Sequence, residues 1–192
     1  MAARSTNLRW GWVTRALHWS IALMIFGMIA AGLYAVSIDA STPAGEIAYY
    51  SVIDVHKSFG LTIVMLAAVR LIWRSTETSP TPPPTPTWEL LLARVAQTLL
   101  YVGLFLMPIT GYLWASAYGE PVRFFGLRVP ALVHISGKEA TSAHHVHIYT
   151  AFVLMGIIGL HLAGALKNHF IDRNDVLRKM LGLPDRGLEK VA

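Results

Sequence analysis

The segment that decides the fold is residues 146–166, which read VHIYTAFVLMGIIGLHLAGAL. This segment contains no Asp, Glu, Lys or Arg, and its length matches the about 20 apolar residues that a helix needs to cross about 30 Å of hydrocarbon. His147 and His161 lie near its two ends. The segment therefore predicts a membrane-spanning helix that carries an ionisable side chain near each surface.

Three further apolar runs occupy about residues 17–36, 52–73 and 90–117 of the 192-residue chain. Hydrophobic residues make up 54% of the chain and charged residues 14%, and the mean hydropathy is +0.49. This composition argues against a water-soluble enzyme of the same size. We therefore predict an all-α fold, a transmembrane four-helix bundle in which residues 1–192 form a single integral membrane domain.

The lysines and arginines predict the direction of the spans, because cytoplasmic segments carry the excess of these residues. Four predicted spans place both termini on one side, and that side holds twelve of the sixteen basic residues. The opposite, outer side holds only four, namely Lys57, Arg123, Arg128 and Lys138. Both termini are therefore predicted to be cytoplasmic. The net charge of +5 is then a topology signal and gives no argument for binding nucleic acid.

The predicted connections differ in composition. Residues 79–87 read SPTPPPTPT, and proline at this density favours an extended spacer between the second and third spans. Residues 40–51 and 118–143 are predicted to connect spans on the outer side. Residues 172–183 are predicted to form a short amphipathic helix at the cytoplasmic surface.

Histidine has to hold any metal or redox centre, because the chain has no cysteine. Four of the eight histidines lie in or at the ends of predicted spans, where an ionisable group is costly and points to a function. By depth they form an inner pair, His18 with His161, and an outer pair, His56 with His147. A porphyrin held between two imidazoles takes one ligand from each of two helices, so these four suffice for two haems.

Helix geometry supports this arrangement. His147 and His161 are fourteen residues apart, which returns within roughly 40° to the same helix face and separates them by about 21 Å along the axis. Taken singly, each span histidine could instead be a buried, hydrogen-bonded side chain or a helix-end residue that faces headgroups. His145 is the alternative to His147, because the start of a helix is uncertain by a few residues.

Arg70 follows His56 by the same fourteen residues and is therefore expected on the interior face at the depth of the inner pair. A haem propionate or a quinone oxygen would satisfy its donors there. Lys57 is the second predicted cofactor contact besides the histidines. Several glycines would let a flat macrocycle approach the helices, although small residues also simply allow close packing: Gly27, Gly60, Gly156, Gly159 and Gly164.

The chain resembles the bacterial cytochrome b561 family in stretches that cover most of its length in order. These stretches are ALHW (16–19), HKSFG (56–60) running to VRLIWR (69–74), LMPITGY (106–112), FFGL (124–127), and GLH (159–161) followed by KNHF (167–170). The resemblance implies a multi-pass protein of the bacterial cell inner membrane with two haems b. It also implies that His18 and His161 ligate one haem and that His56 and His147 ligate the other. One departure is Gln97, where relatives often carry a non-ligand histidine.

Two imidazoles on each iron leave no open coordination position, which favours electron transfer over chemistry at the metal. We expect electrons to pass between a small reductant at the outer face and the quinone pool. Superoxide is an admissible anionic donor for the four outer cations and ubiquinone an admissible acceptor, as in a superoxide:ubiquinone oxidoreductase. No nucleophile–base constellation or other catalytic residue is predicted, and the expected partners are quinone, a small or protein redox partner and the lipid bilayer.

Two alternative functions and two alternative ligand sets stay open. The chain could be the haem-carrying membrane anchor of a larger dehydrogenase or hydrogenase complex, or a haem-free transporter that uses its histidines as a proton relay. A metal site formed by His134, His144 and His145 with Glu139 is conceivable, although solvated loop residues are the expectation. Met107 could act as an axial ligand, although a methionine beside Pro108 in an apolar span is far more often a packing residue.

Overall fold

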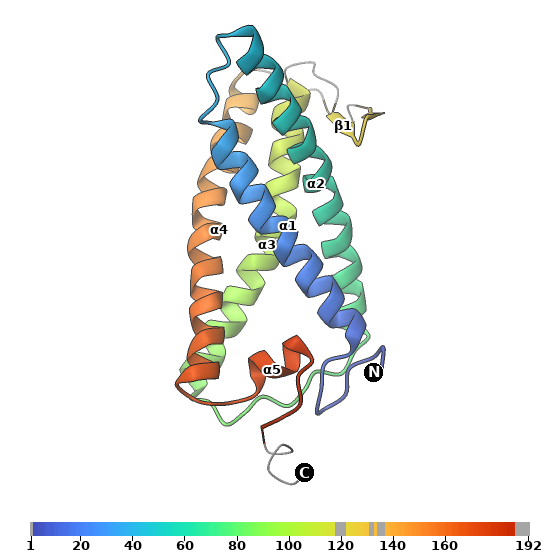
Figure 1. Cartoon of the computed structure of the whole chain (residues 1–192), viewed down its shortest axis with the longest axis vertical. Coiled ribbons are helices and arrows are strands. Elements are labelled where there is room, and N and C mark those ends of the chain that lie inside the picture. Colours follow the sequence, from blue (N-terminus) through green and yellow to red (C-terminus); the bar gives the residue numbers. More distant parts are fainter. Residues whose placement is uncertain (1, 118–121, 131–132, 134–136, 187–192) are drawn as a thin grey trace. The chain divides into compact units, whose positions relative to one another are not determined.

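The computed structural model describes residues 2–117, 122–130, 133 and 137–186. In this part of the chain it contains five helices and one two-stranded antiparallel sheet (Figure 1). The elements in chain order are α1 (Trp12–Ala35), α2 (Pro43–Ser75), α3 (Thr87–Ala117), β1 (Val122–Phe124), β2 (Leu127–Val129), α4 (Lys138–Phe170) and α5 (Val176–Leu181).

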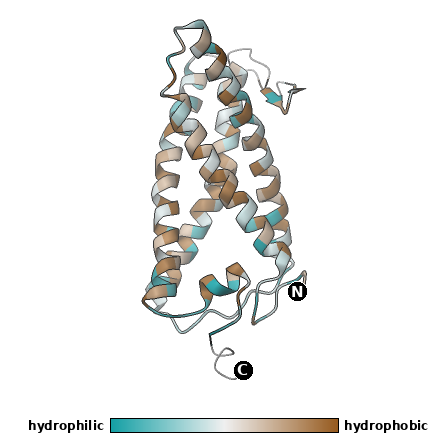
Figure 2. Ribbon diagram, in the orientation of Figure 1, coloured by the Kyte–Doolittle hydropathy of each residue, from teal (hydrophilic) through white to brown (hydrophobic). Residues whose placement is uncertain are grey.

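Four of the helices, α1 to α4, are long and apolar enough to cross a membrane, with mean hydropathies of 1.6 to 1.8 in their most apolar windows. At most 22% of any such window is buried within the protein. Hydrophobic residues therefore face outward along the helices. Figure 2 shows how much of these four helices is hydrophobic (brown). An apolar surface of this extent requires lipid around it. The predicted all-α fold with four apolar spanning helices is confirmed.

The helices extend beyond the apolar runs on the predicted outer side. α2 begins at Pro43 and α4 at Lys138, so residues 43–51 and 138–143 are helical where the sequence suggested connections. Thr42 explains the early start of α2, because its hydroxyl accepts a hydrogen bond from the backbone N–H of Gly45 at 3.1 Å. Proline is favoured in the first turn that follows such a cap. Hydropathy identifies only the part of a helix that crosses the lipid, so the predicted spans did not include these polar helix ends.

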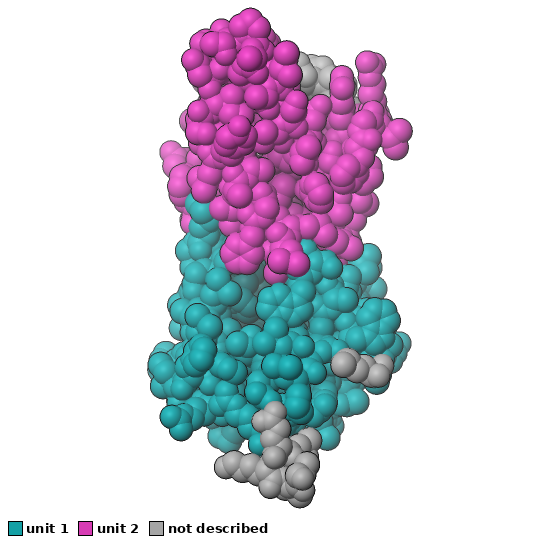
Figure 3. Space-filling view, viewed as in Figure 1, with its two compact units in different colours: residues 1–20, 68–101, 154–192 teal, residues 21–67, 102–153 magenta. Residues whose placement is uncertain are grey.

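Two compact units make up the described structure, and each of α1 to α4 contributes a segment to both (Figure 3). Unit 1 comprises residues 1–20, 68–101 and 154–192, and unit 2 comprises residues 21–67 and 102–153. Residues 76–86 in unit 1 form neither helix nor strand, as expected for the proline-rich spacer. The short helix predicted within 172–183 is also present, although it is limited to α5.

A polar network in unit 1 holds the N-terminal segment. The Glu77 carboxylate accepts hydrogen bonds from the Ser5 backbone N–H at 3.1 Å, from the Ser5 hydroxyl and from the Thr14 hydroxyl at 2.9 Å. Burial raises the pKa of the Glu77 carboxyl, but these hydrogen bonds and the nearby Arg4 guanidinium outweigh burial and lower the pKa below its usual value. Ionised Glu77 therefore stabilises the docked N-terminal segment.

Replacement of Glu77 by alanine is expected to lower the free energy of unfolding by about 1 to 2 kcal/mol at neutral pH, because the donors of Ser5 and Thr14 lose a charged acceptor. A depressed pKa in the folded state stabilises the protein above the unfolded-state pKa, near 4.5, and this stabilisation disappears as the pH falls through the folded-state value. Thermal unfolding in detergent should therefore show a gap between wild type and Glu77→Ala that closes at acidic pH. Glu46→Ala, at an exposed position on α2, is the control; a gap of equal size at both pH values would contradict the prediction.

Candidate functional site

The inner histidine pair lies in unit 1. His18 on α1 and His161 on α4 face each other with ring centroids 6.3 Å apart. The indole of the neighbouring Trp19 donates a hydrogen bond to the carbonyl oxygen of Met180 in α5 at 3.1 Å. The structure thus brings together the two inner histidines that the sequence paired by depth, and it places α5 against the helix that carries one of them.

Arg70 on α2 joins this inner pair. Its Nη1 lies 2.9 Å from Nδ1 of His18, and its Nε donates to the hydroxyl of Tyr101 on α3 at 3.0 Å. In the described part of the chain Arg70 forms no ion pair with a carboxylate. Tyr101, which lies near the middle of the predicted span 90–117, was not identified from the sequence. The guanidinium therefore carries an uncompensated charge beside the inner pair.

The outer pair lies in unit 2. His56 on α2 and His147 on α4 have ring centroids 6.3 Å apart, the same spacing as in the inner pair. Nδ1 of His147 lies 3.0 Å from the carbonyl oxygen of Met107 and 3.3 Å from the hydroxyl of Thr110, both on α3. A hydrogen bond from Nδ1 to a carbonyl fixes the ring and its tautomer, and leaves Nε2 free to bind a metal. Met107 thus contributes its backbone carbonyl to His147.

Two glycines bring helix backbones close to the outer rings. A Cβ atom on Gly111 of α3 would lie 3.1 Å from Cε1 of His147, and a Cβ atom on Gly32 of α1 would lie 3.6 Å from Cε1 of His56. Neither glycine was singled out from the sequence. Of the five glycines that were, Gly60 would meet only Met28, and the other four have no neighbouring atom within 4 Å. Which glycines come close to the histidine rings therefore depends on how neighbouring helices are rotated and shifted relative to one another.

The spacing of both pairs fits a metal between two imidazoles. A histidine nitrogen lies roughly 1.2 Å from its ring centre and binds a first-row metal at about 2.0 to 2.1 Å, so rings on opposite sides of one metal have centroids about 6.4 Å apart. Nδ1 of His56 is buried and has no hydrogen-bond partner among the described residues. The described residues contain no group of three or more His, Cys, Asp or Glu that could hold an ion. A two-histidine site therefore suits a porphyrin, which supplies its own nitrogen ligands.

The other outer histidines are placed differently. His144 stacks on the indole of Trp114, with ring centroids 4.1 Å apart and an angle of 19° between the planes. His145 is exposed, and its ring contacts Tyr149 and His144. His134 lies outside the described residues. The structure therefore pairs His56 with His147 and not with His145.

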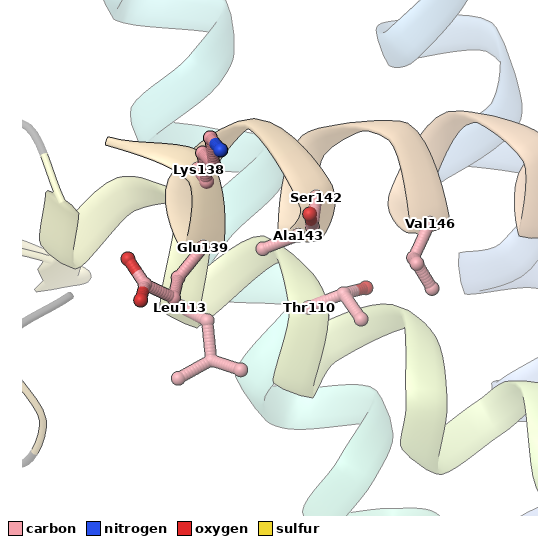
Figure 4. Close-up of a pocket in the computed structure, with 7 residues that line it drawn as sticks. All are labelled: Thr110, Leu113, Lys138, Glu139, Ser142, Ala143 and Val146. Atoms are coloured by element: carbon pink, nitrogen blue, oxygen red, sulfur yellow. The ribbon is translucent and has the colours of Figure 1, made fainter. Parts of the chain in front are cut away.

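An apolar cleft of about 440 Å³ lies between α3 and α4 in unit 2 (Figure 4). Leu113, Ala143 and Val146 supply apolar walls, and Lys138 lies at one end. Thr110 lines the cleft and also contacts His147, so the cleft reaches a residue that touches the outer pair.

The predicted outer cations also lie in unit 2. Lys57 follows His56 on α2 and is half-buried. Arg123 on β1 lies opposite Arg128 on β2. Lys138 is the first residue of α4. Unit 2 therefore carries these four basic residues together with acidic residues such as Asp39, Glu46, Asp54 and Glu139.

This chain is similar to several known proteins of one family. Residues 9–183 match the family model of prokaryotic cytochrome b561. The chain is 36% identical to cytochrome b561 homolog 2 of Escherichia coli over 95% of its own length and 96% of that protein. It is 24% identical to cytochrome b561 homolog 1 of Escherichia coli, covering 86% and 92% of the two chains. It is 28% identical to a probable superoxide oxidase, CybB, of Yersinia pestis, covering 66% and 73%.

The match to the family model covers nearly the whole described chain, including all four of the span histidines and all four long helices. The predicted family is thereby confirmed. The chain belongs to the prokaryotic cytochrome b561 family, whose members are membrane electron-transfer proteins that bind haem b.

Proposed function

We propose that the protein carries electrons across the membrane between a small anionic reductant at its outer face and ubiquinone, through two haems b. His18 and His161 would hold one haem, and His56 and His147 the other. The observation that carries this proposal is the equal spacing of 6.3 Å in the two histidine pairs. When bound, a haem with two axial histidines takes up and releases one electron at a time and offers no open position for a substrate.

Arg70 is proposed to contact the inner haem. Because an arginine always donates, its contact with Nδ1 of His18 makes that nitrogen an acceptor and places the ring proton on Nε2. A His18 that binds metal through Nε2 would carry its proton on Nδ1 instead. Arg70 would then need another acceptor, and a propionate suits its paired donors. Tyr101 would keep the guanidinium in place through Nε.

Superoxide is the donor that we propose, and two observations support it. The outer side carries Lys57, Arg123, Arg128 and Lys138, and cations near a site raise the encounter rate of a small anion. One relative is named a probable superoxide oxidase. Lys57 would additionally lie near the outer haem, because it follows His56 directly.

Ubiquinone is the proposed acceptor. Because the electrons would pass through both haems before they reach it, ubiquinone is expected to bind beside the inner pair, in unit 1. Two superoxide anions would each give one electron and leave as dioxygen, and the quinone would take both electrons and two protons from water to become quinol.

We place the protein in the bacterial inner membrane as one integral domain, residues 1–192, with cytoplasmic termini. The proposed spans are about 17–36, 52–73, 90–117 and 146–166. Twelve of the sixteen basic residues then lie on the cytoplasmic side, which is the distribution that membrane insertion favours.

The purified haem-loaded protein in lipid nanodiscs with ubiquinone provides the test. Superoxide should reduce the haem, as followed in its spectrum, and quinol should then form from ubiquinone. Raising the salt from about 0.01 to about 1 M should slow haem reduction at least about tenfold, because salt screens the attraction between the outer cations and superoxide. A neutral reductant should show no such dependence. Reduction by superoxide that is independent of ionic strength, or absence of quinol, would contradict the proposal. A soluble dehydrogenase or hydrogenase subunit that co-purifies would instead select the membrane-anchor role.

A further inference from the structure

The β1–β2 hairpin presents a pair of arginines on one face. The strands pair antiparallel, with Val122 opposite Val129, Arg123 opposite Arg128 and Phe124 opposite Leu127. Because side chains alternate along a strand, the two arginines share one face and the four apolar side chains share the other. Val122 is 5% exposed, whereas both arginines are exposed. The apolar face is thus turned toward the protein at Val122 and the arginines are turned outward.

The hairpin is firmly held within unit 2. The hydroxyl of Ser58 on α2, a residue that is only 3% exposed, donates to the carbonyl oxygen of Arg123 at 3.1 Å and accepts from the backbone N–H of Phe125 at 3.0 Å. The hydroxyl of Tyr112 on α3 donates to the carbonyl oxygen of Pro130 at 2.7 Å. These contacts hold the arginine pair in place beside α2.

The two neighbouring arginines would be stabilised by a bound anion. Side chains directly opposite in an antiparallel pair have Cβ atoms about 4.5 to 5.5 Å apart, and like charges at this separation are destabilising. Neither Arg123 nor Arg128 forms an ion pair with a carboxylate in the described ranges. Two guanidinium groups side by side match the geometry of a phosphate, to which arginine binds with two parallel hydrogen bonds.

The position of the hairpin along α2 indicates which kind of molecule would supply this phosphate. Ser58 directly follows Lys57, and residues 58–69 of α2 contain no charged side chain, so Ser58 lies at the outer end of the uncharged stretch of this helix. The hairpin therefore packs at the boundary between the hydrocarbon and the headgroups, a region that adds about 5 to 8 Å on each side of the bilayer. A phosphate at this level belongs to a lipid.

The tip of the hairpin has the apolar side chains that such a site needs. Phe125 and Leu127 are 59% and 71% exposed, and the ring of Phe125 contacts Phe59 of α2 at a centroid distance of 5.5 Å. Phe125 also has a φ of 48°, in the left-handed region that a bulky residue rarely adopts. An exposed phenylalanine in this left-handed backbone conformation is better suited to contact lipid than water.

We propose that Arg123 and Arg128 bind the phosphate of an anionic phospholipid in the outer leaflet, with Phe125 and Leu127 directed toward its acyl chains. This site needs neither haem nor a redox partner. It would occupy two of the four outer cations and leave Lys57 and Lys138 to attract a small anionic reductant.

The haem-loaded protein is reconstituted in nanodiscs of phosphatidylcholine that contain a minor fraction of phosphatidylglycerol, and the phosphatidylglycerol retained after extraction into mild detergent is quantified. The double variant Arg123→Gln/Arg128→Gln is expected to lose retention by about 30-fold, the effect of two arginines at a membrane surface. Arg94→Gln, at an exposed position on α3, is the matched control and should retain the lipid. Unchanged haem spectra in all variants exclude misfolding as the cause.

Two further experiments test whether the bound anion is a lipid phosphate or a free phosphate. Inorganic phosphate at the same concentration should not displace the lipid, and displacement would assign the site to a soluble anion and overturn the proposal. Phe125→Asn fits the left-handed backbone and removes the apolar side chain, so it should fold normally and retain several-fold less lipid. Equal retention by Phe125→Asn, or by the double arginine variant, would also overturn it.

Discussion

His18→Ala and His161→Ala are each expected to lose one and the same haem, and His56→Ala and His147→Ala are each expected to lose the other. Each substitution would remove one of the two imidazoles proposed to hold a haem, and the remaining imidazole would lose the partner whose ring centroid lies 6.3 Å away. Haem per protein should fall from two to one in every variant. Haem quantification and reduced-minus-oxidised spectra measure the loss.

The pairing makes this prediction more specific than a loss of haem. Because each pair lies within a different unit, variants of one pair should leave the spectrum and the redox potential of the other haem in place. His145→Ala and His169→Ala remove histidines outside both pairs and should retain two haems. Unchanged stoichiometry in any of the four ligand variants would remove that residue from the site, and two variants of one pair that lose different haems would refute the pairing.

The helices and the histidine pairs could be anticipated because the bilayer imposes strong constraints. A span must be apolar over about 20 residues, so four such runs predict four helices. Within a span, an ionisable residue is rare enough that depth and helical rotation sort the histidines. These constraints led to His18 with His161 and to His56 with His147, and the structure places the members of each pair together.

The contacts that surround the histidines could not be predicted in the same way. Tyr101 reaches Arg70, and Gly111 adjoins His147, through the relative rotation and translation of neighbouring helices. Helices that are apolar on every face carry little periodic signal about which face points inward. The glycines chosen from the sequence were therefore near the histidines along the chain, whereas Gly32 and Gly111 are near them in space.

The hairpin of residues 122–129 was not predicted either, although a signal existed. The tripeptides VRF and LRV alternate apolar and basic residues on either side of Phe125 and Gly126, and both of these residues adopt positive φ angles. Alternation around a two-residue turn that contains glycine is typical of a β-hairpin. Strands of three residues are shorter than those that pattern analysis detects, and they are stable here because α2 and α3 hold them.

Gly111→Val is expected to remove the outer haem and leave the inner haem bound. A Cβ atom at this position would lie 3.1 Å from Cε1 and 3.3 Å from Nδ1 of His147, so even alanine requires the ring to shift by a few tenths of an ångström. The hydrogen bond between Nδ1 and the Met107 carbonyl oxygen restrains such a shift. Alanine should weaken binding of the outer haem, and the branched valine should abolish it.

Backbone effects cannot account for this result, because glycine is about 0.5 to 1 kcal/mol less favourable than alanine within a helix. Gly111→Ala should therefore keep or raise the helical content while it lowers the haem content, and circular dichroism with haem quantification separates the two. Ala93→Val adds a branched side chain at an exposed position of the same helix and should retain both haems. Two haems in Gly111→Val would mean that the imidazole of His147 can move away from α3 and still bind its iron, and the tether to Met107 would then have no part in holding the ligand.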